Sequence, residues 1–151
     1  MALDVLRRFP HFAGLSEASL ERISRITRVR TFEQGDRLFE EGDTAASLML
    51  ILFGEVNLVY KLGNGREVVG DTLLSGDALA WSALLPPHTL TASAVARKAG
   101  SLVEIEAKGL RSMCEEDKEF GYHMMKEVAT MLRSRLSAMR VQIAAGFAER
   151  A

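Results

Sequence analysis

Hydrophobic and polar residues follow three different patterns along the chain, and the first pattern covers residues 1–26. Here the apolar positions recur at steps of three and four, which is typical of a helix that buries one face. Ser16 precedes this run and is a favoured N-cap residue, whereas Pro10 should end a shorter helix before it. The pattern therefore predicts an N-terminal helical segment over residues 1–26.

The second pattern, over residues 27–108, consists of short apolar or alternating runs separated by turn residues. Gly63-Asn64-Gly65 fits a hairpin turn because these residues accept a positive φ. Ser47–Phe53 is the strongest candidate for a buried strand, and Gly54 is expected to end it. Short strands spaced about ten residues apart predict a mainly β protein, an eight-stranded antiparallel β-roll of the jelly-roll type with flanking helices.

The third pattern, over residues 109–151, contains no strand signal and predicts two helices. The first is short and ends near Asp117, and the second runs from Lys118 to about Ala145, a length of about 40 Å. The second helix carries an apolar stripe formed by Val128, Leu132, Leu136, Met139 and Ile143. Because this stripe is longer than a small β-roll can cover, we expect it to pair with a second copy and form a homodimer. The alternative is a helix that folds back on its own roll.

Composition and charge exclude several classes of protein. A chain of 151 residues with 48% hydrophobic residues can bury a core without disulfides, and the single cysteine excludes an internal one. A net charge of -1 argues against binding of nucleic acid through charge alone. The sequence has neither a signal-peptide pattern nor an apolar run of 18 residues, so we expect a cytoplasmic protein without a membrane span.

The sequence shows no catalytic or metal-binding motif. His11, His88 and His123 lack the spacing of metal ligands, and no nucleophile–base pair or phosphate-binding loop is evident. We therefore expect neither an enzyme nor a metal site.

The order of the predicted elements, together with the glycines at their turns, resembles the cyclic nucleotide-binding domain family. That family includes catabolite-activator-type regulators, protein kinase A regulatory subunits and cyclic nucleotide-gated channels. The motifs that carry the resemblance are Gly35-Asp36, Glu41-Gly42-Asp43, Gly54-Glu55-Val56 and Gly76-Asp77. The resemblance covers about residues 9–140. It implies a non-catalytic regulatory domain of signal transduction whose ligand cassette lies at residues 76–92.

The cassette departs from the family at both of its charged positions. In the family a Glu accepts the ribose hydroxyl and an Arg pairs with the cyclic phosphate. This chain has Trp81 at the Glu position and Leu90 at the Arg position, and Ala80 replaces a family Gly. The resemblance implies a vestigial pocket formed by Gly76, Ala80, Trp81, Ser82, Leu84, Leu90, Thr91 and Ala92. Losing a contact worth about 1.5–3 kcal/mol, with an anion left unpaired, should weaken cyclic nucleotide binding at least about a hundredfold.

Three interpretations of function stay open at this point. The chain is a dimeric sensor with weak or no binding of cAMP and cGMP, a domain that binds them through non-standard contacts, or a ligand-free scaffold that binds another protein. In the first case the ligand is absent or is a small, less polar molecule. Trp81 either plugs the pocket as part of the core or serves as a platform for that ligand. Since the chain ends at Ala151, we expect no DNA binding through the helix-turn-helix of the family's transcription regulators.

Overall fold

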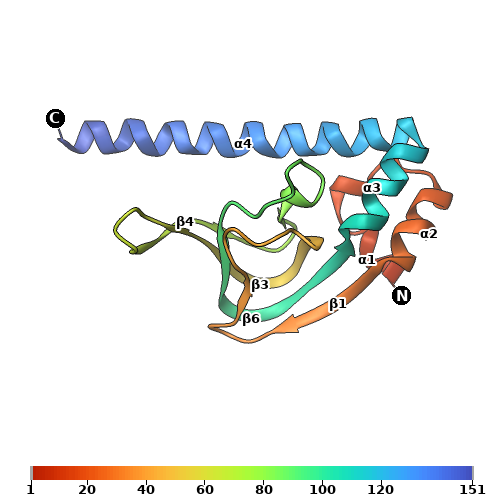
Figure 1. Ribbon diagram of the computed structural model, residues 1–151, viewed down its shortest axis with the longest axis horizontal. Helices are drawn as coiled ribbons and strands as arrows, with labels where there is room; N and C mark the ends of the chain where they lie inside the picture. The colour runs from red at the N-terminus through yellow and green to blue at the C-terminus, as the bar shows by residue number, and fades with distance from the viewer. Residues whose placement is uncertain (1, 151) are drawn as a thin grey trace. The chain divides into compact units, whose positions relative to one another are not determined.

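The computed structural model describes residues 2–150, which form two compact units that divide after Met113. The first unit holds three short N-terminal helices, which are α1 (Ala2–Leu6), the 3-10 helix η1 (Pro10–Phe12) and α2 (Glu17–Arg25). It also holds six strands and a second 3-10 helix, which are β1 (Thr27–Phe32), β2 (Arg37–Phe39), β3 (Ser47–Lys61), β4 (Glu67–Leu73), β5 (Ala78–Leu79), η2 (Trp81–Ala83) and β6 (Ser93–Glu106). Figure 1 shows α1 and α2 beside the end of the sheet at which β1 begins.

The start of α2 follows from local hydrogen bonding. The Ser19 N–H donates to Ser16 Oγ at 3.1 Å, so Ser16 is the N-cap residue that the sequence predicts. The helix then buries Leu20 and Ile23, which share one of its faces. The first of the predicted helical segments thus ends where the sheet begins, at Thr27.

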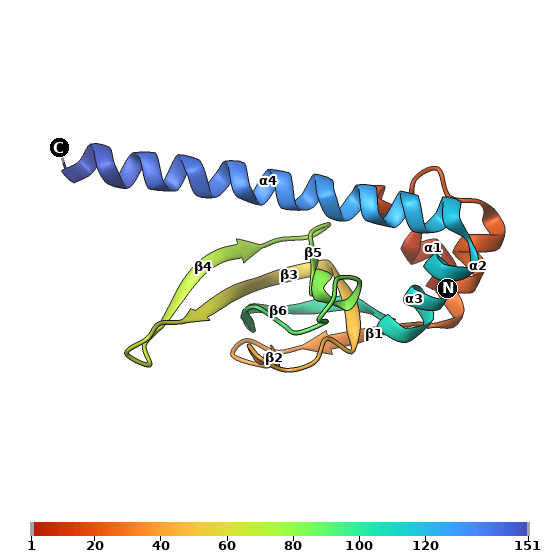
Figure 2. The ribbon, with the colours of Figure 1, turned by 45° about the horizontal axis from the view of Figure 1, so that its top comes forward.

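The sheet of the first unit is antiparallel throughout its strand pairs. Its strand order is β1-β6-β3-β4, and the short strands β2 and β5 pair with β6 and β3. The ribbon in Figure 2 shows these strands curving into a roll, with β4 at one edge. This arrangement confirms the predicted mainly β fold with flanking helices.

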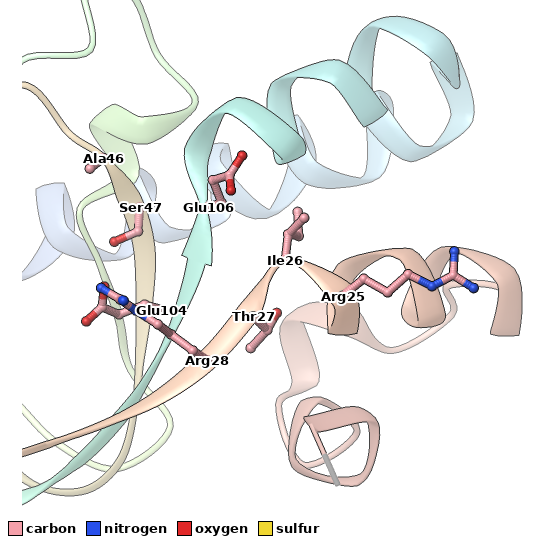
Figure 3. Close-up of a pocket in the computed structure, with 8 residues that line it drawn as sticks. All are labelled: Arg25, Ile26, Thr27, Arg28, Ala46, Ser47, Glu104 and Glu106. Atoms are coloured by element: carbon pink, nitrogen blue, oxygen red, sulfur yellow. The ribbon is translucent and has the colours of Figure 1, made fainter.

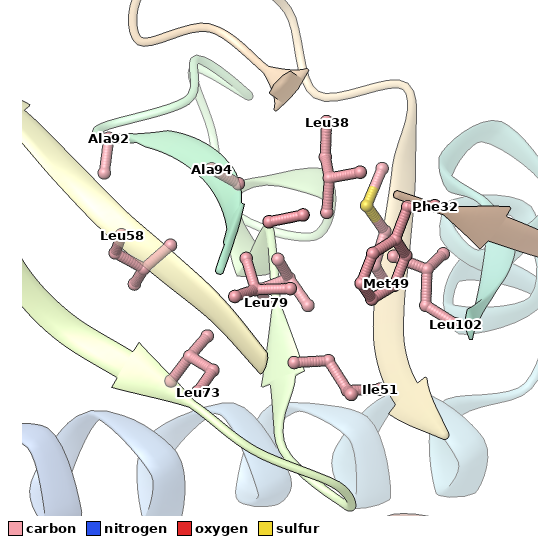
Figure 4. Close-up of a cluster of buried hydrophobic side chains, with 12 residues drawn as sticks. Phe32, Leu38, Met49, Ile51, Leu58, Leu73, Leu79, Ala92, Ala94 and Leu102 are labelled. Atoms are coloured by element: carbon pink, nitrogen blue, oxygen red, sulfur yellow. The ribbon is translucent and has the colours of Figure 1, made fainter. Parts of the chain in front are cut away.

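The interior of the roll is filled by apolar side chains from opposite strands, which converge around Leu79 (Figure 4). Ile51, Leu79 and Leu102 are completely buried, and small alanines of β6 complete the packing. Because close packing of such side chains excludes water, this cluster is the core that holds the roll together.

Residues 2–150 contain six strands, and two of these are long enough to account for two pairs of the eight strands that the sequence predicts. The break expected at Gly54, and another expected at residues 98–100, are β-bulges inside the long strands β3 and β6. Gly54 has φ +96°, and a Cβ on Gly100 would lie 2.0 Å from the Phe53 carbonyl oxygen. Both glycines therefore allow β3 and β6 to bend and to cross closely while their pairing continues. The two strands predicted on either side of each glycine thus form one continuous strand.

Two further helices follow the sheet. Helix α3 (Ala107–Glu116) begins two residues before the predicted boundary, and α4 (Lys118–Arg150) extends beyond the predicted end near Ala145. The N–H groups of Glu119 and Phe120 donate to Asp117 Oδ1 at 3.1 and 3.2 Å. Asp117 therefore caps α4, which is the physical reason that the two helices separate there.

The predicted apolar stripe of α4 divides into two parts by exposure. Leu132, Leu136, Met139 and Ile143 are 48% to 57% exposed, whereas Val128 is 3% exposed. Among residues 2–150, none of the helices combines the length and the apolar character that crossing a membrane requires.

Candidate functional site

The cassette begins at a turn that is anchored to β3. Gly76 has φ +90°, and its N–H donates to the Ile51 carbonyl oxygen at 2.8 Å. The Asp77 carboxylate accepts the Leu74 N–H at 2.8 Å and closes the turn. Strand β5 then pairs with β3, so the start of the cassette is held by backbone hydrogen bonds on both sides.

Ala80 sets the direction of the chain at the centre of the cassette. Its backbone is left-handed, with φ 65° and ψ 40°, and it is the N-cap residue of η2. A left-handed backbone is costly for a residue with a Cβ and is free for glycine. Ala80 thus adopts a conformation that a glycine would adopt without this cost.

Trp81 points into the protein and is 5% exposed. The centroid of its ring lies 6.0 Å from that of His11 in η1, with the two planes tilted by 50°. Its Nε1–H has no hydrogen-bond partner among the described residues. A ring so deeply buried is packed in the core and does not present an exposed platform.

Leu90 is held rigidly by its backbone and is 6% exposed. Its N–H donates to the Asp43 carbonyl oxygen, and its own carbonyl accepts the Gly42 N–H, both at 2.8 Å. The side chain of Leu90, which the sequence predicts to stand at the family's Arg position, is therefore buried and apolar.

The remaining cassette residues have different surroundings. Leu84 and Ala92 are buried, Ala92 as part of the core around Leu79, whereas Thr91 is exposed. The Ser82 carbonyl oxygen lies 3.0 Å from His88 Nδ1. Arg111 of α3 donates from Nη1 to the Ala83 carbonyl oxygen at 2.7 Å, so η2 is also tied to the helix that follows the sheet.

The structure brings two of the predicted cassette residues, Ala80 and Leu90, to the wall of one cavity of about 230 Å³. Apolar side chains of Leu38, Phe39, Met49 and Leu90 line one part of it. Charged residues, namely Arg30, Asp43 and Glu104, line another part. The cavity therefore combines an apolar surface with a few charged groups, which is the usual composition of a small-molecule site.

The sequence does not predict the charged wall of this cavity. Glu104 is 7% exposed, and its two carboxylate oxygens accept from Arg28 at 3.2 Å and Arg30 at 3.3 Å. Alternation along β1 places both arginines on the face of Phe32, a core residue, which is a signal that the sequence contains. Their partner, however, lies more than 70 positions away, as the separation of 74 between Arg30 and Glu104 shows, and only the register of β1 on β6 reveals it.

A second cavity, of about 380 Å³, shares Ala46, Ser47 and Glu104 with the first (Figure 3). Arg28 reaches Glu104 from β1 in this view, while Glu106 stands two residues further along β6. The two cavities thus meet at one buried carboxylate. Among the described residues, no three or more His, Cys, Asp or Glu side chains are grouped so that they could hold a metal ion.

Outside the cavities, Arg37 of β2 links two acidic side chains. Its Nε donates to Glu40 Oε1 at 2.5 Å, and its Nη2 donates to Glu67 Oε2 at 2.8 Å. The hydrogen bond from Arg37 is the main cause that lowers the pKa of the Glu40 carboxyl below its ordinary value. This network joins β2 to the edge strand β4.

Comparison with known proteins places these features in a family. The family model described as the cyclic nucleotide-binding domain matches residues 29–117, which is more than half of the chain. A solved protein of Geobacter metallireducens, described as cyclic nucleotide-binding, is 32% identical, with a TM-score of 0.81 over 90% of this chain and 98% of that one.

Two curated relatives are longer proteins, and this chain matches only part of each. Cyclic nucleotide-gated ion channel 17 of Arabidopsis thaliana is 29% identical over 125 residues, which are 80% of this chain and 17% of the channel. The CRP-like cAMP-activated global transcriptional regulator of Mycobacterium tuberculosis is 22% identical over 130 residues, 86% of this chain and 58% of the regulator. The β-roll and its glycine turns at Gly35, Gly42, Gly54 and Gly76 are consistent with the match over residues 29–117. The chain belongs to the cyclic nucleotide-binding domain family.

Proposed function

We propose that this chain is a non-catalytic sensor domain whose ligand is neither cAMP nor cGMP. The observation that carries the proposal is the burial of apolar side chains, Trp81 at 5% and Leu90 at 6% exposure, at the two positions where the family binds ribose and phosphate. The fold of a regulatory domain is kept, while the groups that recognise a cyclic nucleotide are replaced.

The electrostatics of the neighbouring cavity support this proposal. A cyclic phosphate beside Leu90 would lose water without gaining a cation, and burial of an unpaired anion is costly. Arg30 lines the same cavity, but its guanidinium already pairs with Glu104. Asp43, another carboxylate of the cavity, would repel the phosphate further.

A cavity of about 230 Å³ beside the cassette favours a sensor over a scaffold without any ligand. Its walls include Ala80 and Leu90, so an occupant would contact the cassette both near its centre and near its C-terminal end. A change in the cassette could then reach α3 through the hydrogen bond from Arg111 to the Ala83 carbonyl oxygen.

The sensor is proposed to act as a homodimer through α4. The support is the exposure of Leu132, Leu136, Met139 and Ile143 on one face of the helix. Apolar side chains repeating at steps of three and four are the pattern with which two helices pack along each other.

Titration with cAMP and cGMP tests the proposal. Trp81 is the single tryptophan, so its emission reports on the cassette, and calorimetry provides an independent measure of binding. We expect neither signal to saturate at micromolar nucleotide. Saturable micromolar binding would contradict the proposal and favour cyclic nucleotide recognition through non-standard contacts.

A further inference from the structure

The two cavities share a buried hydroxyl group, that of Ser47. Ser47 is the first residue of β3 and is 8% exposed. Its Oγ makes no hydrogen bond to any of the residues that the structure describes. Burial of a polar group without a partner is unfavourable, so a hydroxyl in the wall of a cavity indicates an occupant that bonds to it.

The register of β3 on β6 places Ser47 and Glu104 on the same face of the sheet. Met49 pairs with Glu104, and Ser47 pairs with Glu106, two residues further along β6. Paired residues point to the same face, and Met49 belongs to the core of the roll. Ser47 and Glu104 are therefore diagonal neighbours on the inner face, a relation that separates two residues by about 7–8 Å. This spacing leaves room for a ligand atom between their side chains, which line the same cavity in Figure 3.

Glu104 is the buried charge of this site, and two arginines already pair with it. Arg28 donates to one of its carboxylate oxygens and Arg30 donates to the other. The other carboxylates of the two cavities, those of Asp43 and Glu106, belong to exposed residues. A ligand with a charged head would therefore lose water without gaining a buried, unpaired charge of opposite sign. This cost applies to an ammonium and to a carboxylate alike, so the site favours a neutral head.

Glu104 and Ser47 together suit a hydroxyl group. A carboxylate has about four acceptor positions, and the two arginines use one on each oxygen. Glu104 can thus accept from the O–H of a ligand, while the Ser47 O–H donates to the oxygen of that same hydroxyl. Since both residues are buried, the two hydrogen bonds would form in surroundings of low dielectric constant, where such bonds are strong.

The cavity beside the cassette supplies an apolar surface for the rest of the ligand. Leu38, Met49 and Leu90 are buried, and Phe39 is half-buried beside them. An apolar cavity of about 150 Å³ accommodates a benzene ring. The cavity of about 230 Å³ thus has room for a ring or a short aliphatic chain that carries a hydroxyl group.

We infer that the cavity lined by Ser47, Glu104 and Leu90 binds small neutral alcohols. The hydroxyl of the alcohol lies between Ser47 and Glu104, and its apolar body lies against Leu38, Met49 and Leu90. This inference rests on the proposed function, because it names the ligand class of the same sensor site.

Three compounds with one skeleton test the inference on the full chain. At neutral pH 2-phenylethanol, phenethylamine and 3-phenylpropionate share a phenylethyl body and carry a neutral, a positive and a negative head. Affinities are measured by calorimetry, and amide shifts in NMR spectra locate the site through Met49 and Leu90. We expect the alcohol to bind at least about tenfold more tightly than either charged compound.

Two matched variants test the hydrogen bond to Ser47. Ser47→Ala removes the hydroxyl and leaves the apolar wall of the cavity intact, so it should weaken binding of 2-phenylethanol about tenfold. Ser101→Ala is the control, because Ser101 is a buried serine of β6 that lines neither cavity, and it should leave the affinity unchanged. Equal affinity of the two variants for the alcohol would overturn the role of Ser47.

The possible results separate this inference from the proposed function. Equal or tighter binding of either charged compound would overturn the inferred ligand class, and so would no binding of 2-phenylethanol up to about 10 mM, as in a cavity that holds only water. If cAMP also fails to bind, the proposed function stands without that class. If cAMP binds at micromolar concentration, the proposed function fails, and the order of affinities within the three compounds still decides for or against an alcohol site.

Discussion

At the scale of one residue, Ala80 adopts a backbone conformation that usually favours glycine. The residue has φ 65°, a conformation that costs about 1–2 kcal/mol for a side chain with a Cβ. Trp81, the next residue, is buried, and so is Leu90 further along the cassette. The surrounding packing therefore maintains a local conformation that alanine alone disfavours.

Substitution of Ala80 by glycine should stabilise the domain. Ala80→Gly removes the steric cost of the left-handed backbone but adds entropy to the unfolded chain, so the expected net gain is about 0.5–1 kcal/mol. The midpoint of urea unfolding measures this change. Ala78→Gly is the matched control, because Ala78 is buried in β5 with an ordinary strand backbone, and it should destabilise the domain. Loss of stability in both variants would show that Ala80 is not strained.

Single residues also mark the limit of what the sequence predicts about the site. The resemblance of the turns to those of the family predicts from the sequence alone that Trp81 and Leu90 stand where the family has Glu and Arg. The pairing of Arg30 with Glu104 is not predicted, because it depends on the register between strands that are distant along the chain. Side-chain chemistry that is local can thus be predicted, whereas chemistry assembled across the sheet requires the structure.

At the scale of elements, the two long strands depend on a close crossing of glycines. Strand β3 bends at Gly54, and β6 bends opposite it at Gly100. The glycines in the sequence indicate that the chain changes direction at both positions. A β-bulge within one strand and a turn between two strands, however, produce the same pattern of residues. This ambiguity accounts for the prediction of eight strands where the sheet has six.

The crossing predicts a large effect of Gly100→Ala. The added Cβ would lie 2.0 Å from the Phe53 carbonyl oxygen and 2.7 Å from Gly54 Cα, both backbone atoms that cannot rotate away. We expect a loss of about 3 kcal/mol or more in the free energy of unfolding, measured by urea denaturation. Gly63→Ala serves as control, because its Cβ would meet nothing within 4 Å and should change stability by less than about 0.5 kcal/mol. Similar stability of the two variants would contradict the crossing.

The ion pair between Arg37 and Glu40 predicts a dependence on pH. Arg37 lowers the pKa of Glu40 in the folded protein, so this pair stabilises the fold above the ordinary Glu pKa of about 4.3 and less as pH falls through the lowered value. In Arg37→Ala the pKa of Glu40 should rise toward its ordinary value, as an NMR titration of its carboxyl carbon would show. The pKa of Glu55, which is lowered mainly by Lys98, should stay the same. An unchanged pKa of Glu40 would disprove the assigned cause.

At the scale of the whole molecule, the exposed stripe of α4 predicts a homodimer. Leu132→Glu combined with Leu136→Glu places two charges on the stripe and should produce monomers in analytical ultracentrifugation, because like charges would face each other across the interface. Ser134→Glu combined with Ala138→Glu adds the same charges at the same spacing on the other side of the helix and should leave a dimer. If the first variant remained a dimer, the interface would lie outside this stripe.

The central claim, that Trp81 and Leu90 remove recognition of cyclic nucleotides, is tested most directly by restoring the family's residues. Calorimetric titration with cAMP compares the parent chain with the variant that combines Trp81→Glu and Leu90→Arg, after circular dichroism has shown that both are folded. We predict no saturable micromolar binding to the parent and a gain in affinity of at least about a hundredfold in the variant. Micromolar binding to the parent, or a folded variant that gains no affinity, would contradict the claim.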